Sequence, residues 1–195
     1  YEAELKKLYE LKVGGRLGPG SKDDKEATCL NRVIRWTDAG LEYEADPRQA
    51  EKLIEELELD GEGVKATVAP GIKALPTQIA EDSLLDASRH TMFRGLAARA
   101  NYLAADRPDC QFAAKEICRW MSAPTELALQ ALKRLCRYLV GRARLVFKYP
   151  FQEAGSWEVY TNTDWGGCIR SRKSTSGGCL LLGQHVIKCW SSTQA

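Results

Sequence analysis

This chain has few histidines and no long apolar run. His90 and His185 are the only two histidines, and neither lies in a recognisable catalytic motif. Gly-x-Ser-x-Gly and His-Glu-x-x-His are also missing, which argues against the usual serine hydrolases and zinc proteases. The most apolar run, residues 179–182, has the length of a strand and is far too short to span a bilayer. We therefore expect no membrane partner.

The seven cysteines lack the spacing of a zinc site. Their number is odd, and no two of them form a Cys-x-x-Cys pair. No signal-peptide pattern is present, and the first residue is Tyr1 instead of methionine. We expect apolar thiols in a reducing compartment. The expected location is intracellular, in cytoplasm or nucleus and not secreted, for a piece cut from a longer polypeptide.

Charge is distributed unevenly along the 195 residues, although the net charge is only +2. Residues 1–87 hold 12 lysines and arginines against 19 aspartates and glutamates, a net charge of −7. Residues 88–195 hold 16 against 7, a net charge of +9. A basic segment of this size favours a polyanionic partner, and nucleic acid is the first candidate. A solvated surface without a partner would have the same composition.

The first third of the chain predicts a hairpin and a helix. Residues 14–27 are rich in glycine and charge and read as a loop. Two β-rich segments, 32–36 and 41–45, flank a turn and predict the hairpin. Asp46 then caps a helix, with Pro47 at its first position and Gln49 completing a capping box. Glycine, proline and acidic residues from 61 to about 86 indicate a linker.

Helical spacing dominates the middle of the chain, and a period of two follows it. Three helices are predicted, over about 88–105, 109–121 and 124–141, with their apolar stripes in the core. The predicted strands are 145–149, 157–161, 178–182 and 185–191. The fold class is therefore α+β: a hairpin plus helix, a helical connection, and an antiparallel β-meander.

Candidate binding residues follow these elements. The strand 157–161 ends in a polar, glycine-rich turn that carries one carboxylate, Asp164, with Asn162 two residues before it. Cations at helical spacing can follow a phosphate backbone without reading its sequence. The candidate nucleic-acid-binding residues are Lys133, Arg134, Arg137, Arg142, Arg144, Arg170, Arg172 and Lys173. Snorkelling side chains on an amphipathic helix would explain the first of these equally well.

Three segments near the end of the chain resemble the start of the ribonuclease H domain in copia-type retrotransposon polyproteins. They are Tyr-Thr-Asn-Thr-Asp-Trp-Gly-Gly over 160–167, Arg-Lys-Ser-Thr-Ser-Gly over 172–177, and residues 190–192. Further blocks, from Phe93 to Gly141, resemble in order the region that connects polymerase and nuclease in that family. The resemblance implies a late reverse-transcriptase-like segment (1–60), a linker (61–87), a helical connection (88–144) and a truncated RNase H-like domain (145–195).

The resemblance also implies that the parent enzyme uses magnesium. In the family, an aspartate that binds the metal stands at the position of Asn162, and Asp164 would be a remnant metal ligand. Hydrolysis with two metal ions needs several carboxylates, and a lone Asp164 cannot supply them. Tyr-x-Asp-Asp, the family's polymerase signature, is absent from these residues. We therefore expect no magnesium bound by this piece and no catalysis by it alone.

The expected function is that of a polyprotein fragment that binds an RNA:DNA hybrid or RNA, with the rest of the polyprotein as a second partner. Two alternatives stay open: a domesticated, standalone nucleic-acid-binding module, and a degenerate remnant without function. Salt-dependent binding to a hybrid would favour the polyprotein fragment and the standalone module over the degenerate remnant.

Overall fold

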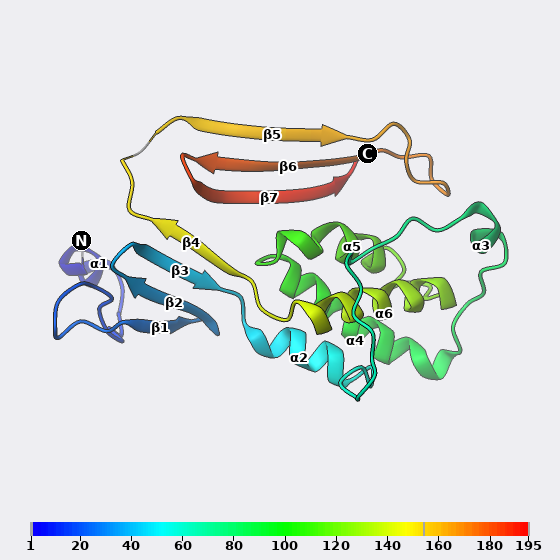
Figure 1. Ribbon diagram of the computed structural model, residues 1–195, viewed down its shortest axis with the longest axis horizontal. Coiled ribbons are helices and arrows are strands. Elements are labelled where there is room, and N and C mark those ends of the chain that lie inside the picture. Colours follow the sequence, from blue (N-terminus) through cyan, green and yellow to red (C-terminus); the bar gives the residue numbers. More distant parts are fainter. Residues whose placement is uncertain (1, 154, 195) are drawn as a thin grey trace.

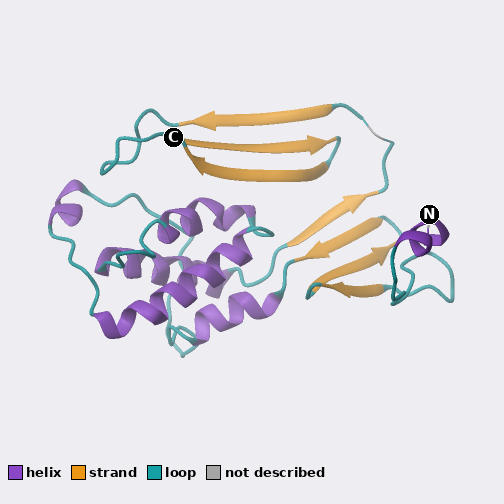
Figure 2. Cartoon of the chain, turned by 180° about the vertical axis from the view of Figure 1, so that it is seen from behind, coloured by secondary structure: helices purple, strands orange, loops and turns teal. Residues whose placement is uncertain are grey.

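The computed structural model describes residues 2–153 and 155–194 (Figure 1). Two antiparallel sheets stand beside a helical body (Figure 2). The helices in these residues are α1 (Glu2–Leu8), α2 (Pro47–Glu55), α3 (Pro76–Ala80), α4 (Ala87–Ala104), α5 (Pro108–Cys118) and α6 (Glu126–Gly141). The strands are β1 (Glu26–Cys29), β2 (Arg32–Thr37), β3 (Gly40–Glu44), β4 (Val146–Pro150), β5 (Trp157–Thr163), β6 (Thr175–Leu182) and β7 (His185–Thr193). The α+β class is confirmed.

The N-terminal sheet has the order β1-β2-β3-β4. The predicted hairpin is confirmed as β2 and β3, and β1 adds a third strand, whose first two residues lie in the segment 14–27 that was predicted to be a loop. Gly40 allows β4 to approach closely, because a Cβ atom there would lie 2.1 Å from the carbonyl oxygen of Tyr149.

The predicted partner of the strand at 145–149 was wrong. That prediction placed it in the C-terminal meander, but β4 pairs with β3, with Lys148 opposite Glu42. The reason lies just before the strand, where the guanidinium of Arg144 binds the carboxylate of Glu44 at the end of β3. This ion pair brings the chain leaving α6 to the open edge of the N-terminal sheet.

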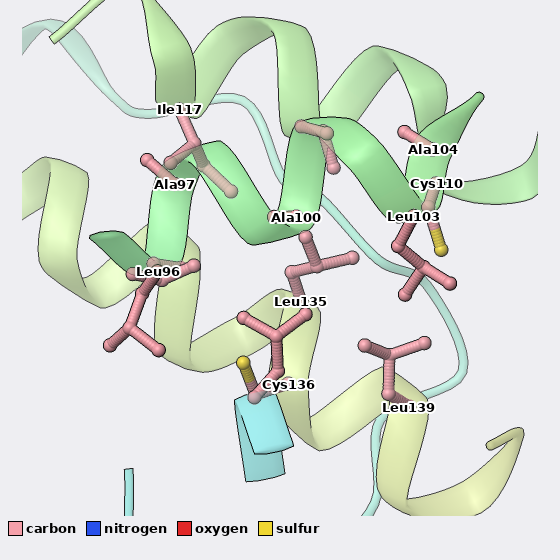
Figure 3. Close-up of a cluster of buried hydrophobic side chains, with 14 of the residues drawn as sticks. Leu96, Ala97, Ala100, Leu103, Ala104, Cys110, Ile117, Leu135, Cys136 and Leu139 are labelled. Atoms are coloured by element: carbon pink, nitrogen blue, oxygen red, sulfur yellow. The ribbon is translucent and has the colours of Figure 1, made fainter. Parts of the chain in front are cut away.

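The core lies between α2, α4, α5 and α6 (Figure 3). Leucine and alanine side chains from the predicted stripes meet there, and Leu96, Leu132 and Leu135 are at most 1% exposed. Leu53 of α2 is fully buried in the same cluster. Helix α2 begins as expected at Asp46, which accepts a hydrogen bond from the backbone N–H of Arg48. The side chain of Gln49 donates to that carboxylate and does not close the predicted capping box.

The segment between α2 and α4 lies along the helical body. Thr67 donates from its backbone N–H to the carbonyl of Arg137 (3.3 Å) and from its hydroxyl to the carbonyl of Arg134 (3.5 Å). Val64 packs against the core, and α3 lies further along the same segment. The stretch predicted as a linker thus covers part of α6.

The C-terminal sheet has the order β5-β6-β7 and lies over α5 (Figure 1). Lys115 donates to the hydroxyl of Thr175 (2.9 Å), and Gln111 donates to the carbonyl of Cys189 (3.2 Å), so α5 touches both β6 and β7. Val159 of β5 and Ile187 of β7 are 59% and 49% exposed.

Candidate nucleic-acid interface

Asn162 and Asp164 lie at the end of β5, as the sequence predicts. Asn162 pairs with Gly177 of β6, and both polar residues are exposed. The Asp164 carboxylate accepts a hydrogen bond from the backbone N–H of Thr175 (2.7 Å), while the Asp164 backbone N–H donates to the Thr175 carbonyl (3.1 Å). Asp164 therefore closes the turn between β5 and β6.

These residues do not fit a site for two magnesium ions. The Oδ1 atom of Asp164 accepts the hydrogen bond from Thr175. The Oδ2 atom lies against Gly167, so close that a Cβ atom added to this glycine would be 1.9 Å from it. Across residues 2–153 and 155–194, no three His, Cys, Asp or Glu side chains come together in a way that could hold a metal ion. Two-metal hydrolysis requires more anionic oxygens than this turn supplies.

Two cavities lie between the C-terminal sheet and the helical body. The first, about 410 Å³ in volume, is bordered by Asn162, Asp164 and Cys189 from the sheet and by Gln111 and Phe112 from α5. The second, about 330 Å³, lies between α5, the segment 70–74 and the turn 164–170. Phe112 lines both and is 53% exposed, so its predicted place in the core was wrong.

Three of the candidate cations belong to α6. Lys133 and Arg134 are half-buried, and Arg137 is exposed. None of the three forms an ion pair within the described part of the chain. Because Thr67 binds the carbonyls of Arg134 and Arg137, the backbone of the preceding segment borders this face.

Three other candidate cations contact side chains of the protein itself. Arg144 binds Glu44, and Arg170 forms an ion pair with Asp82 (2.6 Å) while its guanidinium stacks on Trp120 (4.1 Å to the ring centroid). Arg142 lies over the ring of Tyr138 (5.4 Å). Contacts of this kind join chain segments far apart in sequence, so they account for Arg144 and Arg170 without any nucleic acid.

Arg172 and Lys173 are exposed in the turn between β5 and β6, and no ion pair involves either of them in the residues described. Sequence reasoning missed a third cation beside them, Arg119, the residue that caps the C-terminus of α5. Its guanidinium donates to Cys168 Sγ (3.2 Å) and to the hydroxyl of Ser171 (3.2 Å). No signal in the sequence could have revealed it, because α5 and the turn are about fifty residues apart and meet only in the folded chain.

The same contacts change the chemistry of Cys168. Burial raises the pKa of this thiol, but hydrogen bonds from the side chain and backbone of Ser171 and from Arg119 outweigh burial and lower the pKa to about 7. In contrast, burial raises the pKa of Cys110 and of Cys136 to about 12. The lowered pKa favours the thiolate of Cys168 over those of Cys110 and Cys136, and thiolates are the reactive form of cysteine.

Removing these donors should slow the alkylation of Cys168. In an Arg119→Gln, Ser171→Ala double variant, we expect iodoacetamide to modify Cys168 about tenfold more slowly at pH 7, since the pKa returns toward its ordinary value. Peptide mapping by mass spectrometry over a range of pH measures the rate at this cysteine alone. Arg16→Gln, a change at an exposed arginine, is the control; an unchanged midpoint near pH 7 in the double variant would refute the assignment.

The sequence is similar to two retrovirus-related Pol polyproteins of Arabidopsis thaliana, from the transposons RE1 and RE2. The identity is 38% with the first and 35% with the second, in each case over 102 residues. These matches cover 52% of this chain and 7% of each polyprotein. An uncharacterized mitochondrial protein of Arabidopsis thaliana is 32% identical over 100 residues, which is 51% of this chain and 41% of that protein. The resemblance to copia-type polyproteins is confirmed.

Two other comparisons were negative. No family model matches the sequence, and no solved structure matches it. Among the described residues, no helix has both the length and the apolar character needed to cross a membrane.

Proposed function

We propose that this chain is a segment of a retrotransposon polyprotein that binds an RNA:DNA hybrid or RNA, with the rest of the polyprotein as its other partner. The similarity to Pol polyproteins supports the origin. The observation that carries the binding proposal is that six of the eight candidate cations form no ion pair within the described residues: Lys133, Arg134, Arg137, Arg142, Arg172 and Lys173. Free cations can neutralise phosphates at no cost in internal ion pairs.

The proposed role is binding without cleavage by this chain alone. Asp164 already serves as a turn-closing acceptor for Thr175, and Asn162 beside it carries no charge. A parent enzyme that uses magnesium would have to draw its further carboxylates from outside these residues. Within the chain, the end of β5 would act as a surface beside the bound strand.

Salt-dependent binding tests this proposal. We expect a fluorescently labelled RNA:DNA hybrid to bind the full chain, with a logarithmic salt slope that falls by about one for each phosphate contact removed. Two double variants test the two surfaces: one combines Arg172→Gln with Lys173→Gln, and the other combines Lys133→Gln with Arg137→Gln. Each should reduce the slope by about two and the affinity about tenfold. Fluorescence anisotropy at several salt concentrations provides both values.

The matched control is Lys6→Gln, Lys7→Gln, which makes the same change in net charge on α1, where both lysines already pair with glutamates. If the control weakens binding as much as the two test pairs, general charge and not these surfaces would explain the affinity. If the unaltered chain shows no salt-dependent binding at all, the alternative of a remnant without function gains support.

A further inference from the structure

Two cysteines face one another across the C-terminal sheet. Cys179 of β6 and Cys189 of β7 are register partners, and their Sγ atoms lie 3.1 Å apart, with the Cys189 thiol donating to that of Cys179. Directly paired residues in antiparallel strands have Cα atoms about 4.5–5.5 Å apart, inside the range of about 4.4–6.8 Å that a disulfide spans. A bond between these sulfurs would therefore need no shift of the backbone.

A small reagent can reach this pair. Both thiols are half-buried on the sheet face that α5 touches, and Cys189 borders the cavity of about 410 Å³ described above. Burial first, and then the hydrogen bond to Cys179, raises the pKa of Cys189 to about 12 and keeps the thiol protonated. Cys110 and Cys136, in contrast, are at most 1% exposed inside the helical core.

We propose that Cys179 and Cys189 form a redox-active dithiol that closes to an intramolecular disulfide on reaction with a low-molecular-weight disulfide such as oxidised glutathione. One of the two cysteines loses its proton to solvent, and its sulfur attacks one sulfur of the reagent. The S–S bond of the reagent breaks, and one glutathione leaves and takes up a proton. The other cysteine then loses its proton and attacks the sulfur of the first, and the second glutathione leaves and takes up a proton.

The exchange is balanced in atoms and electrons, because two cysteine thiols are oxidised to one disulfide while one glutathione disulfide is reduced to two glutathiones. The product links β6 to β7 next to the irregular register between Leu180 and Leu181. It holds residues 175–179 in place against 189–193, the strand ends that border the cavity beside Asn162 and Asp164. Since this proposal concerns only the thiols, it stands independently of nucleic-acid binding.

Oxidation of the full chain by glutathione disulfide tests the proposal. We use a Cys168→Ser background, because the Cys168 thiolate would otherwise compete for the reagent. Peptide mapping after an acid quench should show the 179–189 peptides with two hydrogens lost and no glutathione retained. The melting temperature of the oxidised chain should rise by about 5 °C, because a cross-link restricts the unfolded chain.

Single variants separate a true pair from two independent thiols. With Cys179→Ser, glutathione should remain bound to Cys189, since no second thiol displaces it. With Cys189→Ser, glutathione should remain bound to Cys179 for the same reason. Cys29→Ser, at an exposed cysteine, should leave the cross-link unchanged.

Two results would overturn the inference: glutathione that stays on Cys189 while Cys179 is present, or free thiols at both positions under conditions that fully modify Cys29. Circular dichroism checks that the serine variants fold. Alanine at the same two positions provides a second set, and the mapping of the chain with both cysteines decides the question if neither set folds.

Discussion

Replacing Arg107 with methionine should lower the free energy of unfolding by about 3–5 kcal/mol, because it breaks a buried ion pair by removing one partner. The Arg107 side chain is 1% exposed and forms two hydrogen bonds to the Asp109 carboxylate, at 2.9 and 2.7 Å. It also donates to the carbonyls of Arg142 (2.9 Å) and Ala143 (3.1 Å) just beyond α6. All of these acceptors would lose their donor at once.

The pKa values agree with this geometry. Burial would lower the pKa of Arg107, yet the hydrogen bonds to Asp109 raise it above its usual value. Burial likewise raises the pKa of Asp109, but the bonds from Arg107 and from Tyr138 outweigh burial and lower it. The pair is therefore held in its charged form, which makes removal of one partner costly.

Urea unfolding followed by circular dichroism measures the loss. Arg16→Met is the matched control, since its side chain is 82% exposed and should change stability by less than about 0.5 kcal/mol. A double variant, Arg107→Met with Asp109→Leu, should recover part of the loss because the carboxylate without a partner is also removed. A loss below about 1 kcal/mol in the single variant would show that Arg107 does not join α5 to the end of α6.

Replacing Glu44 with glutamine should cost about 2 kcal/mol at pH 7. Its side chain is 3% exposed and accepts hydrogen bonds from Arg144 (2.7 Å) and Arg35 (2.8 Å). The hydrogen bond from Arg144 is the main cause that lowers the pKa of Glu44 to about 2. Burial raises this pKa, and the hydrogen bond from Arg35 lowers it further. We expect less than the full effect of this shift, because Arg144 is 62% exposed to screening by solvent.

The pH dependence follows from the direction of the shift. A carboxylate with a lowered pKa contributes stability above its unfolded pKa, near 4.5, and loses it as the pH falls toward about 2. The difference between the unaltered chain and Glu44→Gln should therefore be constant from pH 5 to 8 and shrink as the pH falls below about 4.5. Urea titrations at several pH values measure it.

Glu42→Gln is the control for this prediction. Glu42 lies on the same strand, but its pair with Lys148 is 3.8 Å long and that lysine is 77% exposed. An exposed pair of this kind contributes at most about 0.5 kcal/mol. Equal losses in both variants, or a loss at Glu44 that does not change with pH, would argue against a buried ion pair at the junction of β3 and β4.

Much of the local structure could be predicted from particular residues. Asp46 and Pro47 marked the start of α2, and Gly141 marked the end of α6. The helix predicted from about residue 109 begins one residue earlier, at Pro108. Each of these signals depends on backbone geometry within a few residues, which is why the sequence contains it. The turn at Asp164 was also placed correctly, since a polar, glycine-rich segment after a strand has few other structures available.

Partners distant in sequence could not be predicted in the same way. The pairing of β4 with β3 and the contact of Arg144 with Glu44 join residues about one hundred positions apart. The eight candidate cations have the same charge in the sequence, and only the folded chain distinguishes Arg144 and Arg170, which are held in ion pairs, from Arg172 and Lys173. An ion pair is decided by distance in space, and the spacing of charges along a chain does not contain it.

The amino-acid sequence by itself determined the α+β class, most of the helices and strands, the basic character of residues 88–195 and the likeness to copia-type polyproteins. These properties follow from composition, short-range periodicity and local motifs. Only the tertiary structure decided which sheet receives β4, which cations stay free, and which two of seven cysteines face one another. Such outcomes result from the packing of two sheets against one helical body, which brings together residues that no local pattern connects.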